Sequence, residues 1–132
     1  MIMGKILVVD DDSVIRNVLK KVLESEKLEV DVAEGGSKAL EFIKNTEYDV
    51  ILLDIIMEDL DGIEVLRKAK KISPLTIVIM MTAYSSPDYV LHALTLGATD
   101  FVEKPFEPEN IIKLVKENVE RVKRWKKTLG LL

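Results

Sequence analysis

The chain has 132 residues, of which 48% are hydrophobic and 32% are charged, and its net charge is -4 at pH 7. This length fits one domain with one core. The acidic balance, with no basic stripe in the first hundred residues, argues against direct nucleic-acid binding. Cysteine is absent, which excludes a disulfide framework and thiolate chemistry.

The sequence has no segment typical of a membrane protein. The longest apolar run, Leu75–Met81, is the length of a strand, well below the roughly 18 residues that a membrane helix needs. The stretch Met1–Lys5 lacks the charged and long apolar regions of a signal peptide. We therefore expect a cytoplasmic protein with no membrane contact.

Short apolar runs alternate along the chain with stretches in which apolar residues recur at helical spacing. The expected strands are Lys5–Val9, Leu28–Ala33, Tyr48–Asp54, Leu75–Thr82 and Asp100–Pro105. The expected helices are Ser13–Leu23, Ala39–Ile43, Ile63–Ala69, Pro87–Leu96 and Glu109–Lys127. Ser13 is the expected N-cap of the first helix, and Gly97 is expected to end the fourth.

Five strand–helix units in succession predict an α/β fold with a parallel sheet, right-handed crossovers and helices on both faces. The fold class is therefore a doubly wound, five-stranded parallel sheet. The second strand alternates and ends in nothing reactive, which favours an edge position. Ligands of such sheets bind at the carboxyl ends of the strands, beside the point where the strand order reverses.

Polar side chains gather at that edge. They are Asp10, Asp11 and Asp12 after the first strand, Asp54 at the end of the third, Thr82 at the end of the fourth and Lys104 at the end of the fifth. Two carboxylates 4 Å apart repel by about 4 kcal/mol at an effective dielectric of 20. Because no His or Cys accompanies them, they suit a hard cation, Mg²⁺ or alternatively Mn²⁺.

The remaining groups suit phosphoryl chemistry. A hydroxyl at Thr82 and an ammonium at Lys104 can hold phosphoryl oxygens. A carboxylate such as Asp54 can act as a nucleophile and become an acyl phosphate.

At these residues the chain closely resembles the receiver domain of two-component response regulators. The likeness spans about residues 5 to 120 and rests on "ILVVDDD", "DVILLDIIMEDLDG", "VIMMTAY" and "GATDFVEKPF". It implies a flavodoxin-like (βα)5 fold with strand order 2-1-3-4-5. It also implies a cis peptide bond before Pro105, which a tertiary amide tolerates.

The resemblance also implies a role for each residue at the edge. Asp54 would be the phosphoacceptor, and Lys104 would be the phosphoryl-binding lysine. The metal would be held by Asp10, Asp11, Asp54 and the backbone carbonyl of Ile56. Thr82 would be the switch hydroxyl, and Phe101 would be the switch aromatic. Asp12 matches no site of the family and is interpreted as a residue of the helix start.

The implied activity is signalling rather than turnover of a separate substrate. A histidine kinase or a histidine phosphotransfer protein would give its phosphoryl group to Asp54 in a Mg²⁺-dependent reaction. The domain would catalyse this transfer and its own slow dephosphorylation. The output would pass through the face made by the fourth helix, the fifth strand and the fifth helix, which is also one expected surface for a homodimer.

One departure concerns the loop after the phosphoacceptor. The family usually has Met-Pro there, whereas Met57 is followed by Glu58, so the rigidity that proline gives is missing. Ile56 and Tyr84 occupy the two positions that tune dephosphorylation in the family. An apolar and an aromatic side chain should hinder an attacking water, so a long-lived phosphoryl group is expected.

Two alternatives of the same fold class remain open. A flavin-binding electron carrier would hold the cofactor phosphate with backbone donors of a Ser/Thr/Gly-rich loop after the first strand, but here that loop carries three acids. A phosphatase with an aspartate nucleophile would place the nucleophile after the first strand and would need a cap, for which no insertion is present.

The end of the chain is expected to differ from the rest. We divide the chain into a receiver domain, residues 1–121, and a helical extension or linker to a missing effector domain, residues 122–132. Val115, Val122, Trp125 and Leu129 fall near heptad spacing. A homodimer through this final helix is therefore a second expectation, beside fraying of a solvated helix end.

Overall fold

A computed structural model describes residues 3–83 and 86–132. Five parallel strands form one sheet in the order β2-β1-β3-β4-β5. The strands are β1 (Lys5–Val9), β2 (Glu29–Ala33), β3 (Val50–Asp54), β4 (Ile77–Thr82) and β5 (Asp100–Glu103). The fold class and the edge position of β2 that the sequence predicted are confirmed, and so is the strand order that the resemblance implied.

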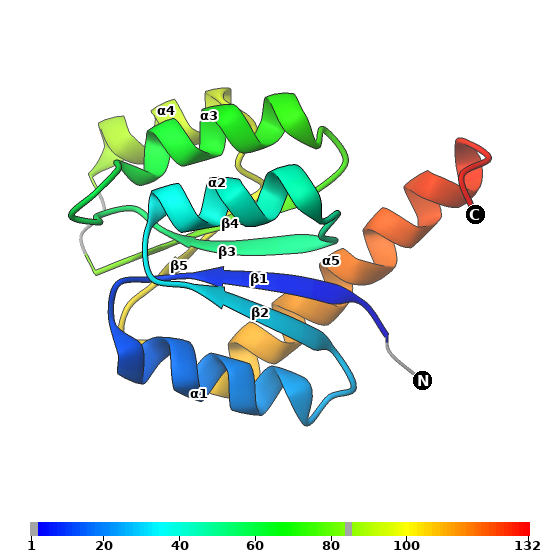
Figure 1. The fold of residues 1–132 in the computed structure, drawn as a ribbon, viewed down its shortest axis with the longest axis horizontal. Coiled ribbons are helices and arrows are strands. Elements are labelled where there is room, and N and C mark those ends of the chain that lie inside the picture. The colour runs from blue at the N-terminus through cyan, green and yellow to red at the C-terminus, as the bar shows by residue number, and fades with distance from the viewer. Residues whose placement is uncertain (1–2, 84–85) are drawn as a thin grey trace.

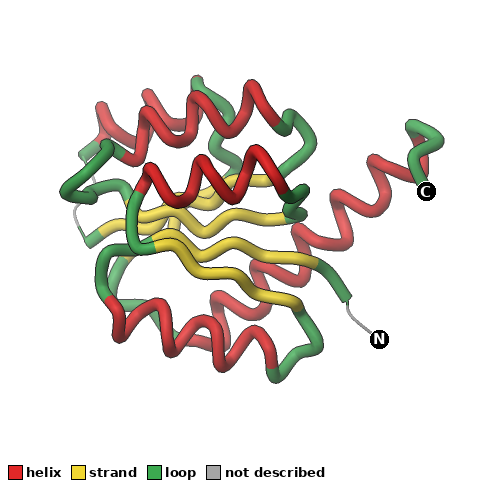
Figure 2. Tube along the Cα trace, viewed as in Figure 1, coloured by secondary structure: helices red, strands yellow, loops and turns green. Residues whose placement is uncertain are grey.

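Five helices cover the two faces of this sheet. They are α1 (Ser13–Glu24), α2 (Gly36–Asn45), α3 (Gly62–Ile72), α4 (Pro87–Thr95) and α5 (Pro108–Thr128). Figure 1 shows α2, α3 and α4 on one face and α1 and α5 on the other. Figure 2 shows the same three layers, helix over strand over helix, by element type.

The two faces of the sheet have separate hydrophobic cores. In β1, Leu7 and Val9 pack into the core beneath α2, α3 and α4, whereas Ile6 and Val8 pack into the core beneath α1 and α5. Successive side chains of a strand point to opposite faces. The unbroken apolar run of β1 is therefore needed because both of its faces are buried.

The start of α1 differs from the prediction. Asp12, not Ser13, is the N-cap: its backbone is extended, and its carboxylate oxygen Oδ1 accepts a hydrogen bond of 2.9 Å from the N–H of Val14. Ser13 is the first helical residue. Aspartate and serine cap equally well, so residue type alone could not separate two neighbours. The interpretation of Asp12 as a helix-start residue is confirmed.

The last helix is the longest, with 21 residues, and it extends past the sheet edge where the strands begin (Figure 1). Gly130 follows it with a positive φ of 74°. The N–H of Gly130 donates to the carbonyl of Lys127, and the N–H of Leu131 donates to the carbonyl of Lys126. These two bonds form a Schellman motif, which closes the helix end. In the described ranges, no helix is long and apolar enough to cross a bilayer.

Candidate functional site

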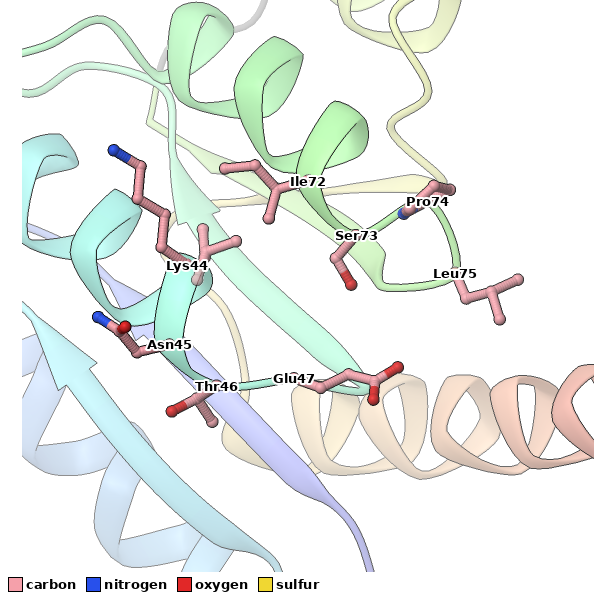
Figure 3. A pocket seen from close by; sticks show the side chains of 9 residues that line it. Lys44, Asn45, Thr46, Glu47, Ile72, Ser73, Pro74 and Leu75 are labelled. Carbon is pink, nitrogen blue, oxygen red and sulfur yellow. The ribbon is translucent and has the colours of Figure 1, made fainter. Parts of the chain in front are cut away.

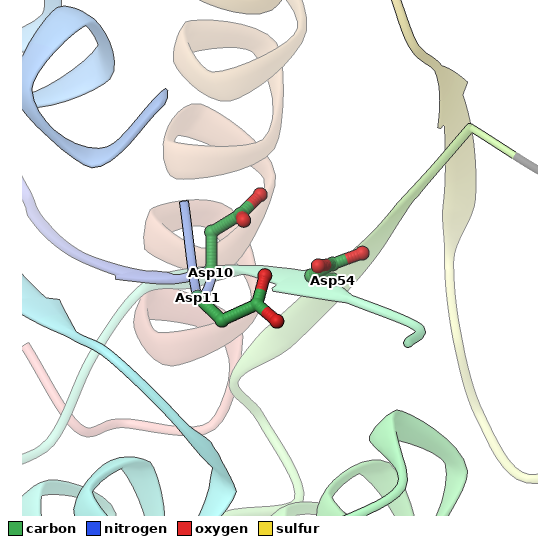
Figure 4. A group of neighbouring side chains, drawn as sticks. All are labelled: Asp10, Asp11 and Asp54. Carbon is green, nitrogen blue, oxygen red and sulfur yellow. The ribbon is translucent and has the colours of Figure 1, made fainter. Parts of the chain in front are cut away.

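Three aspartates meet at the carboxyl ends of β1 and β3. Val9 and Leu53 are paired in the sheet, so the residues that follow them, Asp10 and Asp54, emerge side by side. One carboxylate oxygen from each of Asp10, Asp11 and Asp54 lies within 4.8 Å of the others. Figure 4 shows the three side chains gathered at this edge. The structure thus brings together three of the four aspartates expected at this edge, and the fourth, Asp12, caps α1.

The members of this cluster differ in burial. Asp10 is completely buried, Asp54 is 6% exposed, and Asp11 is exposed to solvent. Asp10 is held firmly: its Oδ1 accepts a bond of 2.9 Å from the N–H of Asp12, and its backbone carbonyl accepts one of 2.7 Å from Arg16 Nη1. A buried carboxylate needs such partners.

Lys104 lies between the two buried acids. Its Nζ is 2.7 Å from Asp10 Oδ2 and 3.5 Å from Asp54 Oδ1. The lysine is placed by the end of β5, where its N–H donates to the carbonyl of Thr82 over 2.7 Å. The peptide bond between Lys104 and Pro105 is cis, as the resemblance implied.

The environment of Asp54 favours its protonated form. Burial, followed by the negative charge of Asp10, raises the pKa of Asp54 from 3.8 to about 6. The charge of Lys104 and the backbone N–H of Ile56 act in the opposite direction. A carboxylate that is poorly solvated yet ionised at pH 7 is suited to nucleophilic attack.

Thr82 and Phe101 occupy the strands next to the acids. Thr82 ends β4 and is 1% exposed. Phe101 is paired with Met80 across β4 and β5, is half-buried, and packs against the core beneath α2, α3 and α4. Both therefore lie where the sequence predicted, one strand and two strands away from Asp54.

The donor set fits a hard divalent cation. The cluster offers only oxygen ligands, and among the described residues its three carboxylates outnumber the ammonium of Lys104, so negative charge is in excess. Mg²⁺ binds through one or two carboxylates and retains water. Asp10, Asp11 and Asp54 would hold such an ion, and the carbonyl of Ile56 stays a predicted fourth ligand.

The loop between β3 and α3, residues 55–61, contains contacts that the sequence did not reveal. Asp59 accepts hydrogen bonds from two backbone N–H groups at the start of α2. Asp61 caps α3 through the N–H of Ile63 and also accepts a bond of 3.2 Å from the hydroxyl of Tyr89 on α4. Each contact joins residues more than twenty positions apart or depends on loop geometry, so no local sequence pattern predicts it. Only the N-cap role of Asp61 has a signal, an Asp before an apolar stripe.

Other residues raised by the sequence have simpler places. Glu58 is exposed on the same loop. His92 is exposed near the end of α4. Tyr84 lies outside the described residues.

A pocket of about 390 Å³ lies at the other end of the sheet, between the α2–β3 and α3–β4 connections (Figure 3). It is lined by the ends of these helices and includes one carboxylate, Glu47, and one ammonium, Lys44. It lacks the clustered acids of the carboxyl edge and does not compete with that edge as a phosphoryl site.

Comparisons with known proteins agree with this geometry. Residues 6–116 match the family described as the response regulator receiver domain. The transcriptional regulatory protein ResD of Bacillus subtilis is 40% identical over 119 residues, which are 89% of this chain and 48% of ResD. The DNA-binding transcriptional regulator NtrC of Escherichia coli is 38% identical over 116 residues, 88% of this chain and 25% of NtrC. The chain thus spans half or less of these two relatives.

Solved structures show the same fold. A receiver domain protein (CheY-like) from Methanospirillum hungatei superposes with a TM-score of 0.89 at 34% identity, covering 92% of this chain and 97% of that chain. NtrX from Brucella abortus superposes with a TM-score of 0.89 at 30% identity, covering 98% of this chain and 30% of NtrX. The acidic cluster lies at the carboxyl edge, the lysine follows β5, and the family match covers most of the chain. The chain therefore belongs to the response regulator receiver domains of two-component signalling.

Proposed function

We propose that this receiver domain accepts a phosphoryl group on Asp54 from a histidine kinase or a histidine phosphotransfer protein, in a reaction that requires Mg²⁺. The observation that carries the proposal is the placement of Asp54: a nearly buried carboxylate that shares a cluster with Asp10 and Asp11 and lies 3.5 Å from Lys104. Membership in the receiver family favours this function over flavin binding and over a phosphatase.

In the proposed transfer, an Oδ atom of Asp54 forms a bond to phosphorus while the bond from phosphorus to the donor's imidazole nitrogen breaks. The electron pair stays on that nitrogen, which takes up a proton from solvent. The bound Mg²⁺ would supply charge neutralisation on the attacking and transferring oxygens. Lys104 and the hydroxyl of Thr82 would hold the remaining phosphoryl oxygens. The protonated form of Asp54 cannot attack, so transfer should slow in acid; because a bound cation favours the ionised carboxylate, this slowing should set in below the pKa of about 6 of the metal-free protein.

The proposed output is a change in the face formed by α4, β5 and α5. A phosphoryl group on Asp54 would draw Thr82 towards it and open space that Phe101 can fill. Such a group shifts the equilibrium only by its differential stabilisation of the active state, and a change from 1:99 to 99:1 needs about 5.5 kcal/mol. Thr82→Ala should therefore accept phosphate while its NMR spectrum shows little change over this face.

The proposed setting is the cytoplasm, where a kinase or phosphotransfer protein would be the donor. ResD and NtrC are transcriptional regulators by name, so control of an output domain is one role that this receiver could serve. The apolar Ile56, whose side chain is 60% exposed, supports a long-lived phosphoryl group by limiting the approach of water.

The test is incubation of the full chain with a small phosphodonor, with and without Mg²⁺, followed by intact-mass measurement. We expect one added phosphoryl group that requires Mg²⁺ and is absent from Asp54→Asn. Incorporation that is equal in Asp54→Asn, or that does not need a divalent cation, would contradict the proposal.

A further inference from the structure

The start of α2 is capped by a residue from another part of the chain. The N-cap of this helix is Gly35, which has no side chain to accept a hydrogen bond. Asp59 takes over this role: its Oδ1 accepts a bond of 3.0 Å from the N–H of Gly36, and its Oδ2 accepts one of 3.0 Å from the N–H of Ser37. These are two of the N–H groups that a helix leaves unpaired at its start.

The backbone at this point is shaped to receive the carboxylate. A Cβ atom on Gly35 would lie 2.7 Å from Asp59 Oδ1, and one on Gly36 would lie 2.7 Å from atoms of Leu60 and Val65. The two glycines therefore let the β3–α3 loop come into direct contact with the helix start. The two N–H groups are also the main reason why the pKa of Asp59 is lowered, as expected for a charge-assisted contact.

The loop that Asp59 fastens is the one that carries the predicted metal ligand. The loop end is fixed beside Asp54: the N–H of Gly62 donates to the carbonyl of Ile55 over 2.9 Å, and a Cβ on Gly62 would lie 2.5 Å from the Asp54 carbonyl oxygen. Ile56 lies between the two fixed points of the loop, which are Ile55 at its start and Asp59 in its middle. Residues 55–61 contain no proline that would stiffen this stretch, so the hydrogen bonds of Asp59 are the contacts that restrain its middle.

We propose that Asp59 is a positioning residue for the cation site: by fastening the β3–α3 loop to the start of α2, it holds the carbonyl of Ile56 in place for the ion. Asp59 acts through the loop and does not itself contact the ion. This inference rests on the proposed function of the acidic cluster. Residues that orient metal ligands typically change metal affinity by about 10- to 100-fold when they are removed.

The experiment is a calorimetric titration of the unphosphorylated full chain with Mg²⁺, for the wild type, Asp59→Ala and Asp59→Asn. We expect the dissociation constant to rise about 10-fold in Asp59→Ala and by less in Asp59→Asn, which keeps one acceptor oxygen. Phosphorylation by a small phosphodonor should need correspondingly more Mg²⁺ but reach nearly the wild-type rate at saturation. A variant that was merely unstable would lose rate at all Mg²⁺ concentrations.

Glu34→Gln is the matched control, because Glu34 is an exposed carboxylate that lines the same hollow as Asp59, while the two hydrogen bonds at the start of α2 belong to Asp59. It removes one negative charge near the cluster without releasing the loop, and its Mg²⁺ affinity should stay close to the wild-type value. An unchanged affinity in Asp59→Ala, or an equal loss in Glu34→Gln, would overturn the positioning role. Since the titration needs no phosphate, failure of wild-type phosphorylation at Asp54 would count against the proposed function and not against the role of Asp59.

Discussion

The ammonium of Lys104 lies closer to Asp10, at 2.7 Å, than to Asp54, at 3.5 Å. The lysine thus makes its shorter ion pair with a residue proposed to bind the metal, while it remains within reach of the proposed nucleophile. A group in this position offsets the charge of both buried acids. In the proposed transfer, Lys104 would exchange its longer contact with Asp54 for one with a phosphoryl oxygen.

Replacing Lys104 should change the titration of Asp54. Lys104 is the nearby charge that lowers the pKa of Asp54, so Lys104→Met should move this pKa upwards from about 6. Carbon-13 NMR of the Asp54 carboxyl during a pH titration measures it directly. Lys104→Arg is the control, because it keeps the positive charge and should move the midpoint less. If the midpoint in Lys104→Met does not rise, the lysine is not coupled to Asp54 as the distance indicates.

The raised pKa of Asp54 makes stability depend on pH. Its folded-state pKa, about 6, exceeds the ordinary value of 3.8, so the folded state binds this proton more tightly than the unfolded state does. The free energy of unfolding should therefore fall, by about 1–3 kcal/mol, as the pH rises from about 4 through 6. Asp54→Asn should remove this loss and be more stable than the wild type at pH 7.5.

Urea denaturation at pH 4, 6 and 7.5 measures the effect. The advantage of Asp54→Asn should shrink at pH 4, where Asp54 is protonated in the folded state and already partly protonated in the unfolded state, which makes the acidic sample an internal control. An advantage that is equal at all three values would show that it does not come from the ionisation of Asp54.

Gly62 should tolerate no side chain. A Cβ atom there would lie 2.5 Å from the carbonyl oxygen of Asp54 and 2.8 Å from Ile55 Cα, both of which belong to the backbone and cannot move aside. Gly62→Ala should lower the free energy of unfolding by about 1–3 kcal/mol and weaken Mg²⁺ binding. Gly130→Ala is the comparison, since its Cβ would meet nothing within 4 Å and its strain is confined to a helix end. Equal destabilisation of the two variants would contradict the packing argument.

The sequence was most informative where one physical rule determines which residues lie together in the fold. Parallel strands carry the residues at their carboxyl ends to one edge, so Asp10, Asp54 and Lys104 could be placed together from the sequence. The contact of Asp59 with Gly36 could not be found in this way, because it joins residues 23 positions apart through a loop of irregular backbone. Gly35 and Gly36 make room for the loop there, and nothing in their sequence context shows which part of the chain they admit.

The final helix is a second case in which the sequence pattern alone does not determine what a residue contacts. Its apolar stripe was correctly identified, but Val115 and Val122 are 0% and 1% exposed and belong to the core of this chain. Spacing cannot tell a helix that packs on its own sheet from one that pairs with a second chain. Only Trp125, 38% exposed, and Leu129, 60% exposed, continue the stripe beyond the core. The division of the chain at residue 122 stays a prediction.

The exposed end of α5 provides the test of the dimer expectation. Trp125→Ser and Leu129→Ser remove the exposed apolar side chains and leave the buried Val122 intact, which a truncation at residue 120 would not do. If this end pairs two chains, sedimentation should show a concentration-dependent dimer in the wild type and a several-fold weaker one in the double variant, with and without phosphorylation. A wild type that stays monomeric in both states would exclude this role for the tail.

The most direct test of the central claim is to trap the phosphoryl group where it forms. Borohydride reduces an acyl phosphate to an alcohol but leaves ordinary carboxylates unchanged, so a phosphorylated aspartate becomes homoserine. After treatment with a phosphodonor and Mg²⁺, peptide mass spectrometry should find homoserine at position 54 and at none of positions 10, 11 and 12. Homoserine at one of those three positions, or unreduced aspartate at position 54 in phosphorylated protein, would contradict the assignment of Asp54 as the phosphoacceptor.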